Sequence, residues 1–145
     1  MKPLKTYIIV ASEKAARLLE NDGVGKGVYQ FTHITIEDSG VMHHEFADEP
    51  TKTQLAHGPT SGVEPRTRLD EENRESFAKY LAELAEAAFR SGDYDRLVIV
   101  AGPKMLGELR KALAGKVDVY AELDKDLINT PTDKMAKHLA EILAV

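Results

Sequence analysis

The chain has 145 residues and no cysteine, with 43% hydrophobic and 30% charged residues. This length suits one domain built around one core, and the lack of cysteine excludes disulfides and thiolate chemistry. The formal net charge of -5 argues against binding nucleic acid mainly through phosphates, because proteins that do so usually carry a basic surplus. We therefore expect a soluble globular protein, one domain over residues 1–145, with no DNA partner.

The beginning of the chain lacks the pattern of an export signal. Its apolar run, residues 7–11, is followed at once by Ser12, Glu13 and Lys14. A signal peptide needs a longer apolar stretch and a small-residue cleavage site, and no apolar run approaches the ~18 residues of a membrane helix. The sequence predicts a cytoplasmic protein that does not insert into membranes.

The first half of the chain predicts mainly strands. Residues 6–12, TYIIVAS, are apolar enough for a central strand that is buried on both faces. Residues 26–37 alternate and are rich in β-branched and aromatic residues, which favours a second strand. After a turn at 38–40, residues 41–46 are expected to pair back as an edge strand. Residues 13–22 have helical propensity but span only about two turns, so helix and strand both remain open.

Residues 47–69 predict a long loop with three prolines and two glycines. Its composition cannot bury enough apolar area to offset the entropy of ordering, so we expect it to be mobile. Loops of this length are often functional. The loop is locally basic, which suits either a solvated segment or an arm that faces RNA or a protein partner. The candidate binding residues in it are Lys52, His57, Arg66 and Arg68.

The second half of the chain alternates helical and extended patterns. Helices are expected where apolar residues recur at helical spacing between start and stop signals. For the last helix, Thr130 is the expected N-cap, with Pro131 at the first helical position. The expected order is helix 70–92, strand 95–102, helix 103–115, strand 116–123 and helix 130–145.

Right-handed crossovers through these helices make the late strands parallel to the first one. Segments 6–11, 96–101 and 117–122 are therefore expected to be mutually parallel. Together with the early strands this predicts an RNase H-like α/β fold. It is a mixed five-stranded sheet, three antiparallel strands and then two parallel strands, with helices packed on it. A flavodoxin-like open sheet is the alternative if residues 13–22 form a helix.

Three motifs in residues 70–143 follow one another at characteristic spacing. The segment FAKYLAELAEAAFRSGDYDRLVIVAGPKMLGELRKAL, followed by VYAELDKDLINTP, resembles the bacterial host-attachment protein family. Members share a long helix, a strand and helix of the FDRLVLVAPPxxLGxLR type, and an ELDKDL segment before the last helix. That family is similar in turn to the RNase H-like middle domain of archaeo-eukaryotic release factors. The resemblance implies that AARLLE, within residues 13–22, is a strand.

The resemblance also bears on function. In the release-factor domain, the loop before the long helix carries a Gly-Gly-Gln tripeptide that acts in peptide release. The loop at 47–69 contains Gln54, Gly58 and Gly62 but not the tripeptide, so that activity does not transfer. The family name implies a role in attachment to host cells. Without an export signal, that role is expected to be indirect.

The ELDKDL segment, residues 122–127, raises the question of catalysis. Glu122 and Asp124 would point to one face of a strand, and with Asp126 they could bind a divalent cation or share a proton. RNase H-like nucleases also need a carboxylate on the first strand, and residues 6–12 contain none. Ion pairs with nearby basic residues explain such a cluster as well. We therefore expect a structural segment. Its expected buried residues are Leu123 and Leu127.

Residues 101–104, AGPK, follow a predicted parallel strand and precede a helix. Open α/β sheets bind anions at this position, which makes Gly102 and Lys104 candidate binding residues. The alternative is a plain strand-helix connection with Pro103 at the first helical position.

No catalytic residue, metal site or cofactor is predicted. His43 and His44 are adjacent, so on a strand they would point to opposite faces, which is poor spacing for one metal ion. Ser12 has no identifiable base partner. The leading hypothesis is a non-enzymatic interaction module with an unidentified protein, ribosome or RNA partner. The alternatives are a ribosome- or tRNA-associated protein similar to release factors, and a metal-dependent hydrolase that uses the ELDKDL carboxylates.

Overall fold

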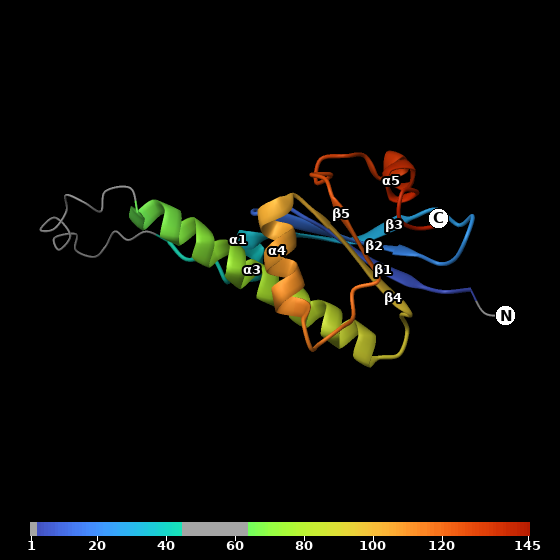
Figure 1. Cartoon of the computed structure of the whole chain (residues 1–145), viewed down its shortest axis with the longest axis horizontal. Coiled ribbons are helices and arrows are strands. Elements are labelled where there is room, and N and C mark those ends of the chain that lie inside the picture. Colours follow the sequence, from blue (N-terminus) through green and yellow to red (C-terminus); the bar gives the residue numbers. More distant parts are fainter. Residues whose placement is uncertain (1–2, 45–63) are drawn as a thin grey trace, which may run out of the picture.

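The computed structural model describes residues 3–44 and 64–145, which fold around one mixed β-sheet (Figure 1). The five strands are β1 (Thr6–Ala11), β2 (Ala15–Asn21), β3 (Tyr29–Thr35), β4 (Arg96–Ala101) and β5 (Ala121–Asp124). Their order across the sheet is β3-β2-β1-β4-β5. The pairs β1–β2 and β2–β3 are antiparallel, whereas β1–β4 and β4–β5 are parallel. The mixed five-stranded sheet and its three mutually parallel strands are thus confirmed, and the narrower RNase H-like classification stays a prediction.

Helices cover both faces of the sheet. They are α1 (Ile36–Ser39), α3 (Glu64–Arg90), α4 (Pro103–Leu113) and α5 (Thr132–Leu139). In Figure 1, α3 and α4 lie on one face, and α5 lies on the other. Because β1 is central, Ile9 is buried toward α3 and α4 while Ile8 is buried toward α5. Burial on both faces explains why this strand is apolar throughout. None of the described helices combines the length and the apolar character that a membrane span requires.

Residues 13–22 contain a strand, as the family resemblance implied, and the helix favoured by propensity is wrong. In β2, Leu18 packs into the core below α3 while its neighbour Leu19 packs into the core below α5. Only an extended backbone sends adjacent side chains to opposite faces. Burial of two leucines therefore outweighs the small helical preference of the segment.

The edge strand predicted for residues 41–46 is wrong, because the described part, 41–44, forms no strand. The chain leaves β3 through α1 instead of through a tight turn. Thr35 caps this helix by accepting a hydrogen bond from the amide of Asp38 (3.0 Å), and Gly40 ends it with φ of 79°. Ile36 is buried under the sheet, which fixes the helix against the core.

Helix α3 starts at Glu64, so the loop predicted for 47–69 is wrong over its last six residues. Once the amphipathic part of a helix has formed, each added residue gains a backbone hydrogen bond without a new nucleation cost. The other residues of that expected loop, 47–63, with Lys52 and His57, and with them its expected mobility, lie outside the described residues.

The last two elements are shorter than predicted. β5 begins at Ala121 rather than at 116, and α5 covers Thr132–Leu139 rather than 130–145. Pro131, not Thr130, is the N-cap of α5, and no side-chain hydrogen bond caps the helix. The carbonyl group of Thr130 is engaged elsewhere, in a contact with β2 that is described below.

Candidate functional site

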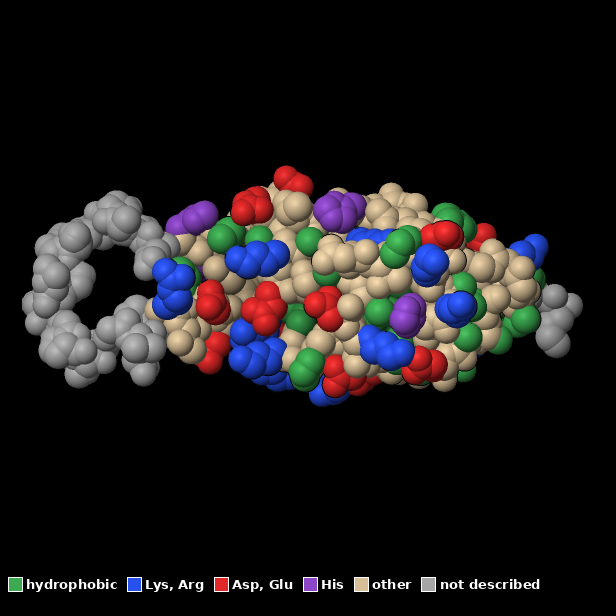
Figure 2. Space-filling view, turned by 90° about the horizontal axis from the view of Figure 1, so that it is seen from above, with side chains coloured by type: hydrophobic (Ala, Val, Ile, Leu, Met, Phe, Trp, Pro, Cys, Tyr) green, Lys and Arg blue, Asp and Glu red, His purple; other side chains and the backbone are tan. Residues whose placement is uncertain are grey.

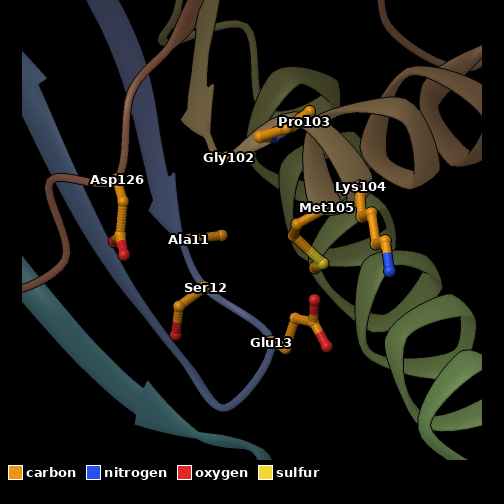
Figure 3. Close-up of a pocket in the computed structure, with 8 residues that line it drawn as sticks. All are labelled: Ala11, Ser12, Glu13, Gly102, Pro103, Lys104, Met105 and Asp126. Atoms are coloured by element: carbon orange, nitrogen blue, oxygen red, sulfur yellow. The ribbon is translucent and has the colours of Figure 1, made fainter.

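A small pocket lies at the carboxyl ends of β1, β4 and β5 (Figure 3), with a volume of about 280 Å³. These three strands are parallel, so the segments that follow them converge at one edge of the sheet, where open α/β sheets commonly bind ligands. The pocket is lined by Ala11, Ser12, Glu13, Gly102, Pro103, Lys104, Met105 and Asp126.

The charges around this pocket are mixed. Lys104 and Asp126 lie on opposite sides of it in Figure 3. The first turn of α4 adds a partial positive charge, because no side chain caps its free amide groups, although Pro103 contributes no amide proton. Glu13 is held in an ion pair with Arg74 (3.2 Å between Nη2 and Oε1). The carboxylates weaken the attraction of Lys104 and the helix terminus for an anion.

Ser12 serves the turn between β1 and β2. Its hydroxyl oxygen accepts hydrogen bonds from the amides of Lys14 (3.2 Å) and Ala15 (3.1 Å), and it donates to the carbonyl of Ala15 (3.3 Å). These bonds fix a tight hairpin and place Glu13 at the rim of the pocket.

The three carboxylates of the ELDKDL segment do not converge. Glu122 accepts two hydrogen bonds from Arg110 of α4, at 2.9 and 2.7 Å, which hold the pKa of Glu122 below its ordinary value. Asp124 is exposed, and Asp126 lines the pocket. Across residues 3–44 and 64–145, no group of three or more His, Cys, Asp or Glu side chains is arranged to hold a metal ion.

The rest of the segment is packed as predicted. Leu123 and Leu127 are only 7% and 5% exposed and lie in the core beneath α5, which confirms their expected burial. Lys125 forms an ion pair with Glu141, in the turn after α5. The segment therefore alternates side chains that enter the core with side chains that form surface pairs.

Arg17 of β2 organises the chain that follows ELDKDL. It is only 7% exposed. Its Nη1 donates to the carbonyls of Leu127 (3.3 Å), Ile128 (3.1 Å) and Thr130, while its Nη2 donates to the hydroxyl of Thr132 (2.8 Å). Burial lowers the pKa of Arg17. We call residues 127–132 the anchored turn, because one guanidinium group holds four of its residues.

Sequence reasoning missed Arg17 as a key residue. The only signal is a single cationic side chain in AARLLE, a segment that pairs on both sides within the sheet. A buried arginine requires acceptors, since an unpaired buried charge is costly. Gln30 of β3 accepts a hydrogen bond from Nε (2.7 Å), but the segment that supplies the other acceptors is 110 or more positions away in sequence, and no local pattern indicates which one it is.

A second buried charge, Glu20, joins the other end of the sheet to two tyrosines. Glu20 is 7% exposed and accepts hydrogen bonds from the hydroxyl groups of Tyr29 and Tyr94. Lys5 lies 3.7 Å from the same carboxylate. Tyr94 also packs edge-on against Tyr7, with ring centroids 5.0 Å apart. This cluster fixes the position of β3 against β1 and the segment before β4.

These contacts predict an alkaline titration that depends on Glu20. The hydrogen bond to Glu20 raises the pKa of Tyr29 to about 12, whereas burial raises that of Tyr7 to about 12, from an ordinary value of 10.0. A raised pKa favours the folded state below pH 10, and this contribution is lost as the pH rises through about 12. Glu20→Gln should therefore lower the pKa of Tyr29 and leave that of Tyr7 unchanged. NMR titration of the tyrosine ring carbons checks this, and equal shifts at both tyrosines would contradict it.

The remaining predicted site residues that the structure describes do not line the pocket. Arg66 and Arg68 are exposed on the first turns of α3, and Arg66 lines a separate hollow with His43 and His44. On the face seen from the side of α5, acidic and basic side chains are interspersed (Figure 2). Of the predicted binding residues, the pocket brings together three: Gly102, Lys104 and Asp126. The converging ends of parallel strands are the signal that links them.

Comparison with known proteins identifies the family. The family model described as "Protein required for attachment to host cells" matches residues 7–139. Because this match covers most of the chain, the chain belongs to that family, and the family resemblance in the sequence is confirmed. A search of curated proteins finds no match. The further similarity to the release-factor middle domain stays a prediction.

Proposed function

We propose that this member of the host-attachment family is a non-enzymatic interaction module that acts in the cytoplasm and affects attachment to host cells indirectly. The observation that carries the proposal is how the carboxylates are used. Glu122 is paired with Arg110, and Asp126 accepts a weak hydrogen bond from the amide of Ile128 (3.4 Å). These contacts support a structural role for the segment. Membership of the host-attachment family supports the link to attachment.

The pocket at the carboxyl ends of β1, β4 and β5 is the surface that we assign to the partner. Its volume of about 280 Å³ lies just below the range of small-molecule sites, which is about 300–1,000 Å³. A space of this size suits one protruding polar side chain of a protein partner. Lys104 and Asp126, on its two sides, would then select a side chain that can both donate and accept hydrogen bonds.

A complementation experiment tests the proposal. Deletion of the gene should reduce the number of cells that attach to host cells, and the wild-type gene should restore it. Lys104→Glu should fail to restore attachment, because it replaces the cation at the pocket with an anion, which also cancels the partial positive charge at the N-terminus of α4. The control is Lys111→Glu, an exposed position in the same helix that does not line the pocket. Full rescue by Lys104→Glu would contradict the assignment of the pocket.

The indirect role is tested separately. Purified protein added outside the cells should neither bind host cells nor compete with attachment. Competition by the purified protein would show a direct adhesin instead. Unchanged attachment after deletion, together with co-sedimentation of the protein with ribosomes at moderate salt, would replace the proposal with the ribosome-associated alternative.

A further inference from the structure

One edge of the sheet, formed by β3, is open among the described residues. β3 pairs with β2 on one side, and no other described strand pairs with it. Alternate backbone N–H and C=O groups of an antiparallel edge strand point away from its neighbour and can pair with another chain. Four of the seven β3 residues are exposed, which leaves this edge accessible. They are Tyr29, Gln30, Phe31 and His33.

The two edges of the sheet differ in how they are protected. β5 at the opposite edge has only four residues, two of which are Glu122 and Asp124, and Lys125 follows it. Short length and charge are devices that keep edge strands from pairing with other chains. β3 has seven residues, YQFTHIT, and contains no Asp, Glu, Lys, Arg or Pro. It is rich in aromatic and β-branched residues, which favour strand pairing.

The pairing of β3 with β2 also leaves a regular stretch for a further strand. The register between them shifts between Leu18 and Leu19, so that Phe31 has no partner on β2, as at a β-bulge. Beyond it, residues 32–35 pair one to one with residues 15–18. The bulge thus interrupts only the first part of β3, and the second part has the regular geometry that an added strand requires.

An apolar hollow runs beside this edge. It lies between β3 and α3, has a volume of about 450 Å³, and is lined by Phe31, Ile34, Tyr80 and Leu84 among others. Phe31 is 43% exposed, and Tyr29 is 46% exposed. Exposed aromatic rings at an open edge add apolar area to the backbone hydrogen bonds that the edge offers.

We infer that a second copy of this chain covers the β3 edge, with the two β3 strands antiparallel across a twofold axis. A twofold axis makes the same strand meet itself and closes the assembly, whereas pairing β3 with β5 would be heterologous and open-ended. Two β3 strands can pair without charge repulsion, because β3 carries no formal charge when His33 is neutral. The two five-stranded sheets then join into one continuous sheet.

The mass of the protein in solution tests this inference. Light scattering should give twice the chain mass of 16.0 kDa, with dissociation on dilution. His33→Lys should weaken the dimer about tenfold or more, because a lysine would be desolvated at the edge. The side chain of His33 is exposed, but Arg17 lies opposite it in the register with β2, so a lysine there also adds a like charge beside Arg17. The thermal midpoint of His33→Lys at monomer concentrations separates this folding effect from loss of the dimer. A mass of one chain at every concentration would overturn the inference.

Cross-linking locates the interface. The chain has no cysteine, so a single introduced cysteine can form a disulfide only between copies. Thr32→Cys and His33→Cys should be tested with Asp124→Cys, an exposed position on the opposite edge strand, as the matched control. Disulfides form where Cα atoms lie about 4.4–6.8 Å apart, a range that a residue and its own copy meet only beside the twofold axis, so central residues of β3 are the ones to test. Cross-linking through β3 alone is expected, and cross-linking through Asp124→Cys alone would overturn the inference.

Discussion

Leu123→Ala should lower the free energy of unfolding by about 2–5 kcal/mol, the range for removal of a buried leucine side chain. Leu123 is 7% exposed and packs in the core beneath α5 with Leu127 and Met135. The deleted methyl groups leave a cavity that surrounding strands cannot fill, because β4 and β5 are fixed by their backbone hydrogen bonds. Urea denaturation measures the change.

The neighbouring position gives the matched control. Asp124→Asn should change the free energy of unfolding by less than about 0.5 kcal/mol, because exposed substitutions away from special contacts have small effects. Asp124 is exposed and pairs with no cation among the described residues. If the two variants had equal free energies of unfolding, or if that of Asp124→Asn were lower, packing of Leu123 would not explain the ELDKDL segment.

Arg17→Met should also lower the free energy of unfolding, by about 3 kcal/mol, because hydrogen bonds to a charged group contribute about 1.5–3 kcal/mol each and do not add fully. Methionine replaces the apolar part of the arginine side chain but offers no donor to the carbonyls of Leu127 and Ile128. The anchored turn should loosen first. Hydrogen exchange should therefore accelerate in α5 more than in β1.

Two variants separate the role of Arg17 from the effect of its charge. Arg17→Lys keeps the charge but cannot reach all the acceptors, so it should also be destabilised. Arg110→Met removes an exposed guanidinium that pairs with Glu122, and it should leave hydrogen exchange in α5 unchanged. A stability of Arg17→Met equal to the wild type would mean that the cost of burying the charge offsets its hydrogen bonds. The anchored turn would then be held by packing alone.

The sequence predicts those parts of the fold that depend on which faces of an element are buried. β1 and β4 are apolar after their first residues because helices cover both of their faces, and that pattern indicates central parallel strands. The burial of Leu123 and Leu127 follows from alternation in the same way. The local sequence is sufficient to predict burial in these elements, because the side chains of a strand point to its two faces in alternation.

Other features depend on contacts between distant segments and could not be predicted locally. The start of α5 moves past Thr130 because the carbonyl group of that residue is held by Arg17 of β2. The strand β2 forms because β1 and β3 flank it, against the helical propensity of its residues. Part of the pocket could be predicted from the sequence, because Gly102, Lys104 and Asp126 all follow parallel strands. The ion pair of Glu13 with Arg74 could not, because it depends on how α3 packs.

We propose that the ELDKDL carboxylates shape and support the fold and do not form a metal-dependent catalytic centre. The most direct test is calorimetric titration of the purified protein with magnesium and with manganese, for the wild type and for Asp124→Asn. Glu122 forms an ion pair with Arg110, and Asp126 lines the pocket at the carboxyl ends of the parallel strands. Because the carboxylates do not converge, neither metal should give a binding isotherm with either protein. Tight binding by the wild type that Asp124→Asn abolishes would contradict the claim and favour the metal-dependent hydrolase.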